Sequence, residues 1–275
     1  MTIKIVDINK ENSLLQDSFF RKLSSLYKKG DFTLGFSDGP VEELEKKISK
    51  LTSRKYALGV SSGTFALEAA SYGLGIKSGD EVIVPANTFI STATAAAKYG
   101  AKIVLADVDY ETMNISKESV SKVISSKTKY IFGVNLYGNC LDYDELSEFQ
   151  IPIVEDAAHS FYASFDKVLS GKFGKYSAFS FFPTKVFGSI GDAGMLLFDD
   201  DESYETLKAY RNCGQSKSHY GEMVSSVGRM HVIQALFLLE KLKIIKKLIE
   251  HRRKIARIYD ERFLGSNITT QKIPA

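Results

Sequence analysis

The chain has 275 residues, of which 44% are hydrophobic and 25% charged, so a full hydrophobic core can form and disorder is not expected. The formal net charge of +3 is too small to indicate nucleic-acid binding on its own. Apolar runs stay short of the roughly 20 residues that cross a bilayer, and Met1–Lys10 lacks the apolar block of a signal peptide. We therefore expect a cytoplasmic protein with no membrane partner.

The sequence contains two cysteines, Cys140 and Cys213, which are far apart. They are too few for a disulfide framework, and a cysteine metal site needs more ligands. We expect two reduced thiols and no metal.

The first predicted elements are helices. Apolar residues at helical spacing run from Leu14 to Leu26, and Gly30 should end that helix. A second helix should begin at Pro40, because the fixed φ of proline suits the first helical turn.

Short apolar segments and helical patterns then alternate as far as Asp156. Repeated alternation of strand and helix predicts a mostly parallel sheet with helices on both faces. The predicted strands are Tyr56–Val60, Glu81–Val84, Lys102–Ala106, Tyr130–Leu136 and Ile151–Val154. The predicted helices between them are Thr64–Tyr72, Ser91–Lys98, Lys117–Ile124 and Tyr143–Glu148.

The pattern changes beyond Asp156. Two further strands, Tyr176–Phe182 and Met195–Phe198, are separated by a short loop, which favours a hairpin-like pair over another crossover. The last predicted helices are Asp201–Tyr210 and a long stretch from Met230 to about Phe263. Because the sequence shows no internal repeat, low-complexity tract or linker, we expect one large α/β domain.

The segment from Lys241 to Arg257 reads KLKIIKKLIEHRRKIAR. Its charge could steer an anionic substrate, or contact phosphates in a nucleic-acid-binding module. Its apolar residues recur at helical spacing and no recognition motif accompanies the charge, so the solvated face of an amphipathic helix is the simpler interpretation. We expect no nucleic-acid partner.

Three short motifs carry residue types that suit chemistry, and each also has a plain structural interpretation. In Ser61-Ser62-Gly63-Thr64, at a strand-to-helix junction, helix-start N–H groups and the Thr64 hydroxyl can bind phosphate, but Ser or Thr caps are common. Asp156 ends an apolar strand, so it could face the ligand crevice of an open sheet or merely cap the next segment. Lys185 follows an aromatic strand and Pro183; an amine held away from water is a usable nucleophile, whereas most lysines are solvated.

The three motifs belong to a longer pattern. The stretch SSGTFALEAASYGLGIKSGDEVIVPANTFISTATAAAKYGAKIVLADVD is followed by LYGNCLDYDEL, IVEDAAHS, FSFFPTK and GDAGMLLFDD. In this order the segments resemble the DegT/DnrJ/EryC1/StrS family of pyridoxal-phosphate-dependent sugar aminotransferases, over roughly Phe32 to Phe263. The resemblance implies the large domain of PLP-dependent transferase fold type I (aspartate aminotransferase-like): a mostly parallel central sheet with helices on both faces. It also implies a homodimer with sites at the subunit interface.

The resemblance assigns cofactor-binding roles to particular residues. Gly63 and Thr64 would bind the phosphate of pyridoxal 5′-phosphate, assisted by the Ser180 hydroxyl. Phe89 would stack on the pyridine ring; without the resemblance it would be interpreted as a core aromatic. His159, where many relatives have Gln, would lie near the phenolic oxygen, or else be an ordinary loop histidine.

The resemblance assigns the chemistry to two residues. Asp156 would pair with the ring nitrogen and keep it protonated, which makes the ring an electron sink. Lys185, the catalytic residue, would carry the cofactor as a Schiff base and later move a proton between the substrate's α-carbon and the cofactor's C4′. Relatives that dehydrate sugars have histidine at this position, so Lys185 implies transamination. The implied reaction moves an amino group from L-glutamate to a nucleotide-linked keto-deoxy sugar, for surface polysaccharide, lipopolysaccharide or amino-sugar biosynthesis.

The sequence departs from the family pattern at three places. Val227 stands where relatives have an Asn that reaches the partner subunit's phosphate site, and Cys213 replaces a histidine. The chain ends at Ala275, whereas relatives continue into a small C-terminal domain. We therefore expect residues 1–265 to form the cofactor-binding large domain with an N-terminal helical segment, and residues 266–275 to begin a small domain that is largely absent.

This third departure leaves two expectations open. The apolar face of the last helix should be exposed, mobile or buried by a partner. An alternative function is that of a catalytically impaired or truncated cofactor-binding homologue that acts as a binding or partner chain.

Overall fold

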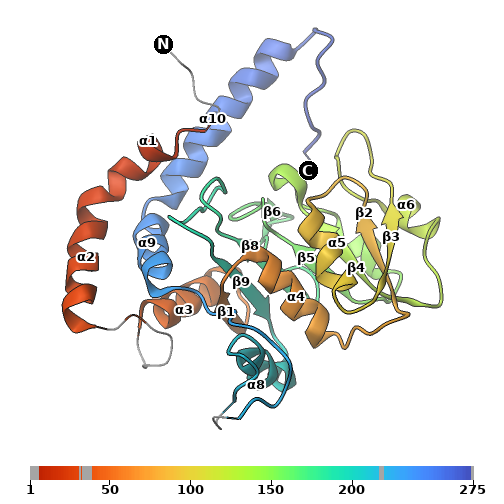
Figure 1. The fold of residues 1–275 in the computed structure, drawn as a ribbon. Helices are drawn as coiled ribbons and strands as arrows, with labels where there is room; N and C mark the ends of the chain where they lie inside the picture. The colour runs from red at the N-terminus through yellow and green to blue at the C-terminus, as the bar shows by residue number, and fades with distance from the viewer. Residues whose placement is uncertain (1–5, 31, 33–38, 217–219, 274–275) are drawn as a thin grey trace.

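The centre of the molecule is a twisted sheet. The computed structural model describes residues 6–30, 32, 39–216 and 220–273, so the expected domain limits 1 and 275 lie outside it. In the described residues a seven-stranded sheet has the order β1-β9-β8-β5-β4-β2-β3 (Figure 1). The strands in that order are Tyr56–Val60, Gly194–Phe198, Tyr176–Ser180, Ile153–Asp156, Thr128–Val134, Glu81–Pro85 and Lys102–Ala106.

One strand runs against the others. The strands β8, β5, β4, β2 and β3 pair in parallel, whereas β9 pairs antiparallel with both β8 and β1. The predicted mostly parallel sheet is confirmed, and so is the hairpin-like pair, because β9 follows β8 without a crossover helix. The connection between these two strands carries Lys185. A small separate hairpin, β6 (Ser164–Phe165) with β7 (Val168–Leu169), was not predicted.

Helices cover both faces of the sheet, as predicted. On one face lie α4, α5 and α8, and on the other lie α2, α3 and α9, with α6 and α7 beside them. Successive side chains of a strand point to opposite faces of the sheet, so each strand contributes to both cores. In β8, Tyr176 and Ala178 pack against the α4, α5 and α8 side, and Phe179 packs against the α2, α3 and α9 side. The helices are α1 Ile8–Asn12, η1 Ser13–Leu15, α2 Gln16–Lys29, α3 Pro40–Thr52, α4 Gly63–Gly73, α5 Ile90–Ala97, α6 Lys117–Ser121, η2 Leu136–Gly138, α7 Tyr143–Ser147, α8 Asp201–Tyr210, α9 Val232–Leu242 and α10 Ile245–Phe263.

The local signals for the first two helices act as predicted. Gly30 follows α2 with a left-handed φ of 70° and its N–H bonds to the carbonyls of Leu26 and Tyr27. Pro40 occupies the first turn of α3.

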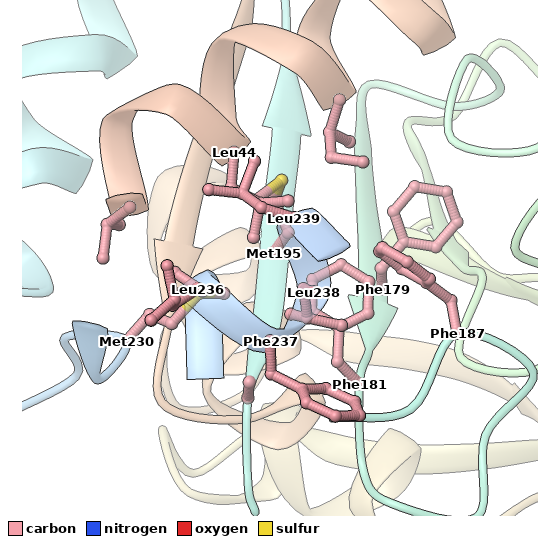
Figure 2. Close-up of a cluster of buried hydrophobic side chains, with 14 of the residues drawn as sticks. Leu44, Phe179, Phe181, Phe187, Met195, Met230, Leu236, Phe237, Leu238 and Leu239 are labelled. Atoms are coloured by element: carbon pink, nitrogen blue, oxygen red, sulfur yellow. The ribbon is translucent and has the colours of Figure 1, made fainter. Parts of the chain in front are cut away.

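The segment that carries Lys185 is anchored in the core on both sides. Phe181 and Phe187 are fully buried, and their rings meet edge to face at 5.3 Å. Phe187 also stacks on Phe161 at 4.2 Å. Figure 2 shows Phe181 and Phe187 within the cluster of buried hydrophobic side chains. Two buried aromatic anchors leave the four residues around Lys185 little freedom to shift, since core side chains pack closely.

The prediction of one long C-terminal helix was wrong in one respect, because the structure has two helices there. Helix α9 ends at Leu242 and α10 begins at Ile245, and Ile244 between them has φ −113° and ψ 0°. The apolar period runs through this break without glycine or proline, so the sequence gives no stop signal there.

The basic segment is not uniformly a solvated face. Lys241 is 1% exposed, donates a hydrogen bond to the Gly188 carbonyl at 3.0 Å and pairs with Glu11 at 2.7 Å. This buried lysine therefore ties α9 to the segment that follows Lys185, and it is unavailable for an external anion.

Helix α10 extends away from the body of the molecule (Figure 1). Ile245 and Ile249 are buried at its start, whereas Ile255, Ile258 and Tyr259 are 41%, 48% and 57% exposed. The outer half of its apolar face is thus exposed, which is one of the outcomes expected from the sequence. Among the helices of the described ranges, none is both long and apolar enough to cross a membrane.

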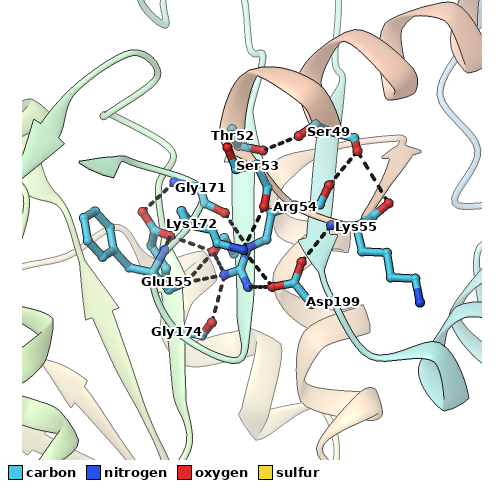
Figure 3. Close-up of polar contacts among 12 residues, drawn as sticks. Ser49, Thr52, Ser53, Arg54, Lys55, Glu155, Gly171, Lys172, Gly174 and Asp199 are labelled. Carbon is cyan, nitrogen blue, oxygen red and sulfur yellow. Dashed lines mark hydrogen bonds and ion pairs between the residues drawn. The ribbon is translucent and has the colours of Figure 1, made fainter. Parts of the chain in front are cut away.

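A buried polar network holds strand β5, which carries Glu155, in place (Figure 3). The Glu155 carboxylate, fully buried, accepts hydrogen bonds from the Gly171 amide at 2.9 Å and the Ser177 hydroxyl at 2.6 Å. Arg54 donates to Ser177 at 2.9 Å, to the Gly171 carbonyl at 2.8 Å and to Asp199 at 3.0 Å. Burial raises the pKa of Glu155, and these donors together with the Arg54 charge act in the opposite direction.

Candidate active site

A cavity of about 520 Å³ lies at the carboxyl ends of the parallel strands. In an open α/β sheet this edge is where ligands bind, because strand ends and helix starts converge there. The seven residues singled out from the sequence all line it: Gly63, Thr64, Phe89, Asp156, His159, Ser180 and Lys185.

The start of α4 forms one wall of the cavity. Ser62 caps this helix by accepting a hydrogen bond from the Phe65 amide at 3.1 Å. The amides of Gly63 and Thr64, the first two helical residues, have no acceptor within the helix. The Thr64 hydroxyl bonds to the Ser91 hydroxyl at 2.8 Å.

Glycine is required here for a close approach between elements. A Cβ on Gly63 would lie 2.7 Å from the Ser180 Cβ, and a Cβ on Gly194 would lie 2.4 Å from the Ser62 carbonyl carbon. Because both side chains are missing, the start of α4 fits against the end of β8 and the beginning of β9. The Ser180 hydroxyl is thereby brought beside the first turn of α4, and Gly194 is a contributor that sequence reasoning missed.

Asp156 ends β5 and is 5% exposed. Its Oδ2 accepts a hydrogen bond from the Thr92 hydroxyl at 2.8 Å, and its Oδ1 accepts one from the Ala158 amide at 3.1 Å. Burial raises the pKa of this carboxyl, while the two donors and the Lys185 charge act to lower it. The local capping contact expected as the plain alternative is therefore present, and the side chain faces the cavity as well.

Lys185 reaches the same cavity from a tight turn. Its amide donates to the Phe182 carbonyl at 2.9 Å, and a Cβ on Gly188 would lie 2.4 Å from the Pro183 carbonyl oxygen. The side chain is half-buried, and burial lowers the pKa of its amine, with Asp156 acting in the opposite direction. A lowered pKa increases the share of neutral amine, which is the nucleophilic form.

His159 and Phe89 complete the set of cavity-lining residues that the sequence singled out. The His159 Nδ1 accepts a hydrogen bond from the Tyr137 amide at 3.3 Å, so the proton of the neutral ring resides on Nε2. Burial, with the Lys185 charge, lowers the pKa of His159 to about 4. Phe89 precedes α5 and is 71% exposed, which excludes the core aromatic that the sequence allowed.

Among the cavity residues that sequence reasoning missed, three carry hydroxyl groups near the start of α5: Thr88, Ser91 and Thr92. Thr88 and Thr92 share a hydrogen bond of 2.9 Å. Thr88 precedes the N-cap of α5 and Thr92 lies in its first turn, so a run of hydroxyl residues around a predicted helix start was the available signal.

The two side-chain departures lie outside the cavity lining. Val227 is 59% exposed and forms an isolated antiparallel bridge with Asn212. Cys213 has a left-handed φ of 58°, and its amide donates to the Ser226 carbonyl at 3.3 Å. Both residues lie between α8 and α9, and neither lines the cavity that contains Asp156 and Lys185.

The donor set fits pyridoxal phosphate. A buried carboxylate whose described hydrogen bonds come from a hydroxyl and an amide, with no basic side chain bonded to it, suits a protonated ring nitrogen. The helix start beside Ser180 suits the phosphate, and the cavity has the size of a cofactor site. An open α/β sheet with this lysine and this carboxylate in one crevice defines a pyridoxal-phosphate enzyme of fold type I.

Comparison with known proteins identifies the family. The family model described as "DegT/DnrJ/EryC1/StrS aminotransferase family" matches residues 15–274, and the chain belongs to that family. The family resemblance stated from the sequence is confirmed.

Three curated relatives illustrate the range of the family. An aminotransferase of Pseudomonas aeruginosa, named for UDP-2-acetamido-2-deoxy-3-oxo-D-glucuronate, is 34% identical over 94% of this chain and 72% of its own length. A protein of Geobacillus stearothermophilus named "Pleiotropic regulatory protein" is 32% identical over 99% of this chain and 74% of its own length. A UDP-N-acetyl-3-dehydro-alpha-D-glucosamine 3-aminotransferase of Acidithiobacillus ferrooxidans is 31% identical over 99% and 74%.

Solved structures agree with the fold. A DegT/DnrJ/EryC1/StrS aminotransferase from Brucella abortus superposes with a TM-score of 0.92 at 30% identity, over 100% of this chain and 76% of that one. A structure described as a sugar aminotransferase from Streptococcus pneumoniae, in its PLP-form, gives a TM-score of 0.84 at 26% identity, over 91% of this chain and 70% of that one. The predicted fold class and the cofactor are confirmed.

Proposed function

We propose that this enzyme transfers an amino group from L-glutamate to a nucleotide-linked keto-deoxy sugar. The observation that carries the proposal is that Lys185 and Asp156 line one cavity, with the start of α4 in its wall. Two of the relatives are named for UDP-linked sugars with a 3-oxo or 3-dehydro group, so this substrate class is the first to test. The product would serve surface polysaccharide, lipopolysaccharide or amino-sugar biosynthesis.

The proposal assigns the cofactor's phosphate to the Gly63 and Thr64 amides and the Ser180 hydroxyl. The helix start favours an anion, because its amides lack acceptors and carry partial positive charge. Phe89 would cover one ring face, and its high exposure leaves its ring available for that contact. Because Nδ1 of His159 accepts a hydrogen bond, its Nε2 carries the proton and would donate to the cofactor's phenolic oxygen.

The chemical work falls to two side chains. When bound, the cofactor supplies an electron sink that stabilises negative charge on the carbon bearing the amino group. Asp156 would hold the ring nitrogen protonated, which preserves that capacity. The Lys185 amine would bind the cofactor's aldehyde carbon and, once released from it, move a proton from the donor's α-carbon to C4′. A neutral amine is needed for both tasks, and the lowered pKa of Lys185 supports this assignment.

A second copy of the chain is part of the proposal. Phe89, Ile90 and Phe182 are 71%, 66% and 46% exposed at or next to the cavity lining. Apolar side chains gathered in this way favour burial against a partner, which supports a homodimer with the sites near its interface. Both cysteines are unpaired, as a cytoplasmic location would favour.

The test begins with cofactor attachment. Pyridoxal phosphate added to the purified chain is expected to give a visible absorption band, and borohydride should fix the cofactor covalently on the peptide that contains Lys185. Lys185→Ala should abolish both results, whereas Lys50→Ala, on the exposed side of α3, should leave both unchanged. Attachment at another lysine would contradict the assignment.

The second step is turnover. Release of 2-oxoglutarate from L-glutamate, followed by amination of one member of a panel of UDP- and dTDP-linked keto-sugars, is the expected result. Cofactor attachment without release of 2-oxoglutarate would instead indicate the non-catalytic binding chain.

A further inference from the structure

A chain of hydroxyl groups connects the start of α5 to the Asp156 carboxylate. Thr92 is fully buried, and its Oγ1 lies 2.8 Å from the Asp156 Oδ2 and 2.9 Å from the Thr88 Oγ1. Thr88 and Thr92 both line the cavity. Thr92 lies in the first turn of α5, and Thr88 lies just before the N-cap residue Phe89, so the entry of the chain into the helix brings the two hydroxyls together.

The geometry fixes the direction of the hydrogen bonds around an ionised Asp156. A hydroxyl has one proton, and a carboxylate can only accept, so Thr92 donates to Asp156. The Thr92 oxygen is then an acceptor, and Thr88 must donate to it. Donation therefore runs from Thr88 to Thr92 to Asp156.

The hydrogen bond to the other carboxylate oxygen of Asp156, Oδ1, also favours the ionised form. The Ala158 amide donates to Oδ1 at 3.1 Å, and an amide cannot accept a proton from a protonated carboxyl. Each oxygen thus has one donor, and each keeps further acceptor capacity for a partner in the cavity. Because the carboxylate is 5% exposed, water can replace a lost donor only poorly.

We propose that Thr92 is a positioning residue for the transamination, and that its hydroxyl, supported by Thr88, fixes the rotation of the Asp156 carboxylate and keeps it ionised toward the cofactor's ring nitrogen. The inference rests on the proposed role of Asp156. A merely structural hydroxyl would bond to a carbonyl of its own helix, as Thr52 does with the Ile48 carbonyl. Thr92 instead bonds across the cavity wall to another element.

The adjacent residue offers an internal comparison. Ser91 bonds to Thr64 at the helix start assigned to the phosphate, whereas Thr92 bonds to Asp156. Ser91→Ala should therefore weaken cofactor binding without changing the protonation of Asp156.

The decisive measurement is the pKa of the Asp156 carboxyl in the cofactor-free chain, by NMR of labelled aspartate carboxyls, with Asp156→Asn identifying the signal. Thr92→Val keeps the shape and removes the donor, so the pKa should rise by about one pH unit, as expected for one lost hydrogen bond to a charged group. Thr92→Ser should restore the original value. Thr94→Val, on the exposed side of the same helix, is the matched control.

Other titratable groups lie near the Asp156 carboxyl and influence its titration. Lys185, His159 and Asp192 face the cavity with Asp156, and Tyr143 of α7 interacts with it electrostatically from the other side. None of these is changed by the variants, so they shift wild type and variants alike. Thr88→Val, which removes the supporting donor, should raise the same pKa by less, and it provides a second variant if Thr92→Val does not fold.

Turnover of the cofactor-loaded enzyme gives an independent readout. Thr92→Val should lower kcat about tenfold and leave both KM values unchanged, since the hydroxyl acts on the ring nitrogen's partner and not on substrate binding. The inference is overturned if Thr92→Val matches Thr94→Val in pKa and kcat, or if Thr92→Ser fails to restore them. Unchanged kcat in Asp156→Asn, with the pKa effect of Thr92→Val intact, would instead refute the proposed role of Asp156.

Discussion

Glu155 and Asp156 are consecutive residues whose carboxylates point to opposite faces of the central sheet. Glu155 joins the Arg54 and Ser177 network on the side of α3, and Asp156 meets Thr92 of α5 in the cavity. The two-residue period of β5 produces this division. One acid therefore stabilises the fold, and the next is available for chemistry.

We expect Arg54, which is buried, to contribute strongly to the stability of the fold. Arg54→Met would remove the donor to Ser177 and to three backbone carbonyls, and it would remove the positive charge near the buried Glu155, so the free energy of unfolding should fall by about 3–5 kcal/mol, measured by urea denaturation. Lys55→Met is the matched control, because that neighbour forms an exposed pair with Asp201 and should have little effect. Equal losses in the two variants would contradict the structural role of the network.

His159 should make stability depend on pH. Its pKa is about 4 in the folded chain, against about 6.5 when unfolded, so its contribution is complete above about pH 6.5. As the pH falls from about 6.5 toward 4, this contribution to the free energy of unfolding is lost, because His159 takes up a proton in the unfolded chain at a higher pH than in the folded chain.

The test compares His159→Gln with the wild type in urea unfolding at pH 7 and pH 4.5. Gln keeps an acceptor for the Tyr137 amide but does not titrate, so the variant should lose less stability than wild type on acidification. His251→Gln, on the exposed surface of α10, serves as the control. A pH dependence identical to that of wild type would refute the burial of a neutral His159.

Gly63 should tolerate no side chain. Gly63→Ala places a methyl group against Ser180, where neighbouring backbone would have to move, and we expect a loss of about 1–3 kcal/mol in unfolding free energy. Affinity for pyridoxal phosphate should fall as well, since the start of α4 would shift. Adding Ser180→Gly should recover most of the stability, because the clashing Cβ is then gone; failure to recover it would place the strain elsewhere.

The sequence by itself determined most of the elements and the residues that line the candidate site. Helix caps, proline and glycine signals and strand alternation act within a few residues, so Gly30, Pro40 and the strands around Tyr56 and Lys102 were predictable. The order of the motifs pointed to Asp156 and Lys185 through its resemblance to a known family, and Asp156 also ends a strand of an open α/β sheet, where ligands bind.

Only the tertiary structure decided which residues support those two. Thr92 meets Asp156 across 64 positions of sequence, and Arg54 meets Ser177 across 123. The break between α9 and α10 and the burial of Lys241 have the same origin, since each depends on packing against other elements. Periodicity and capping are local in the chain, whereas the partner of a side chain is set by where distant segments meet.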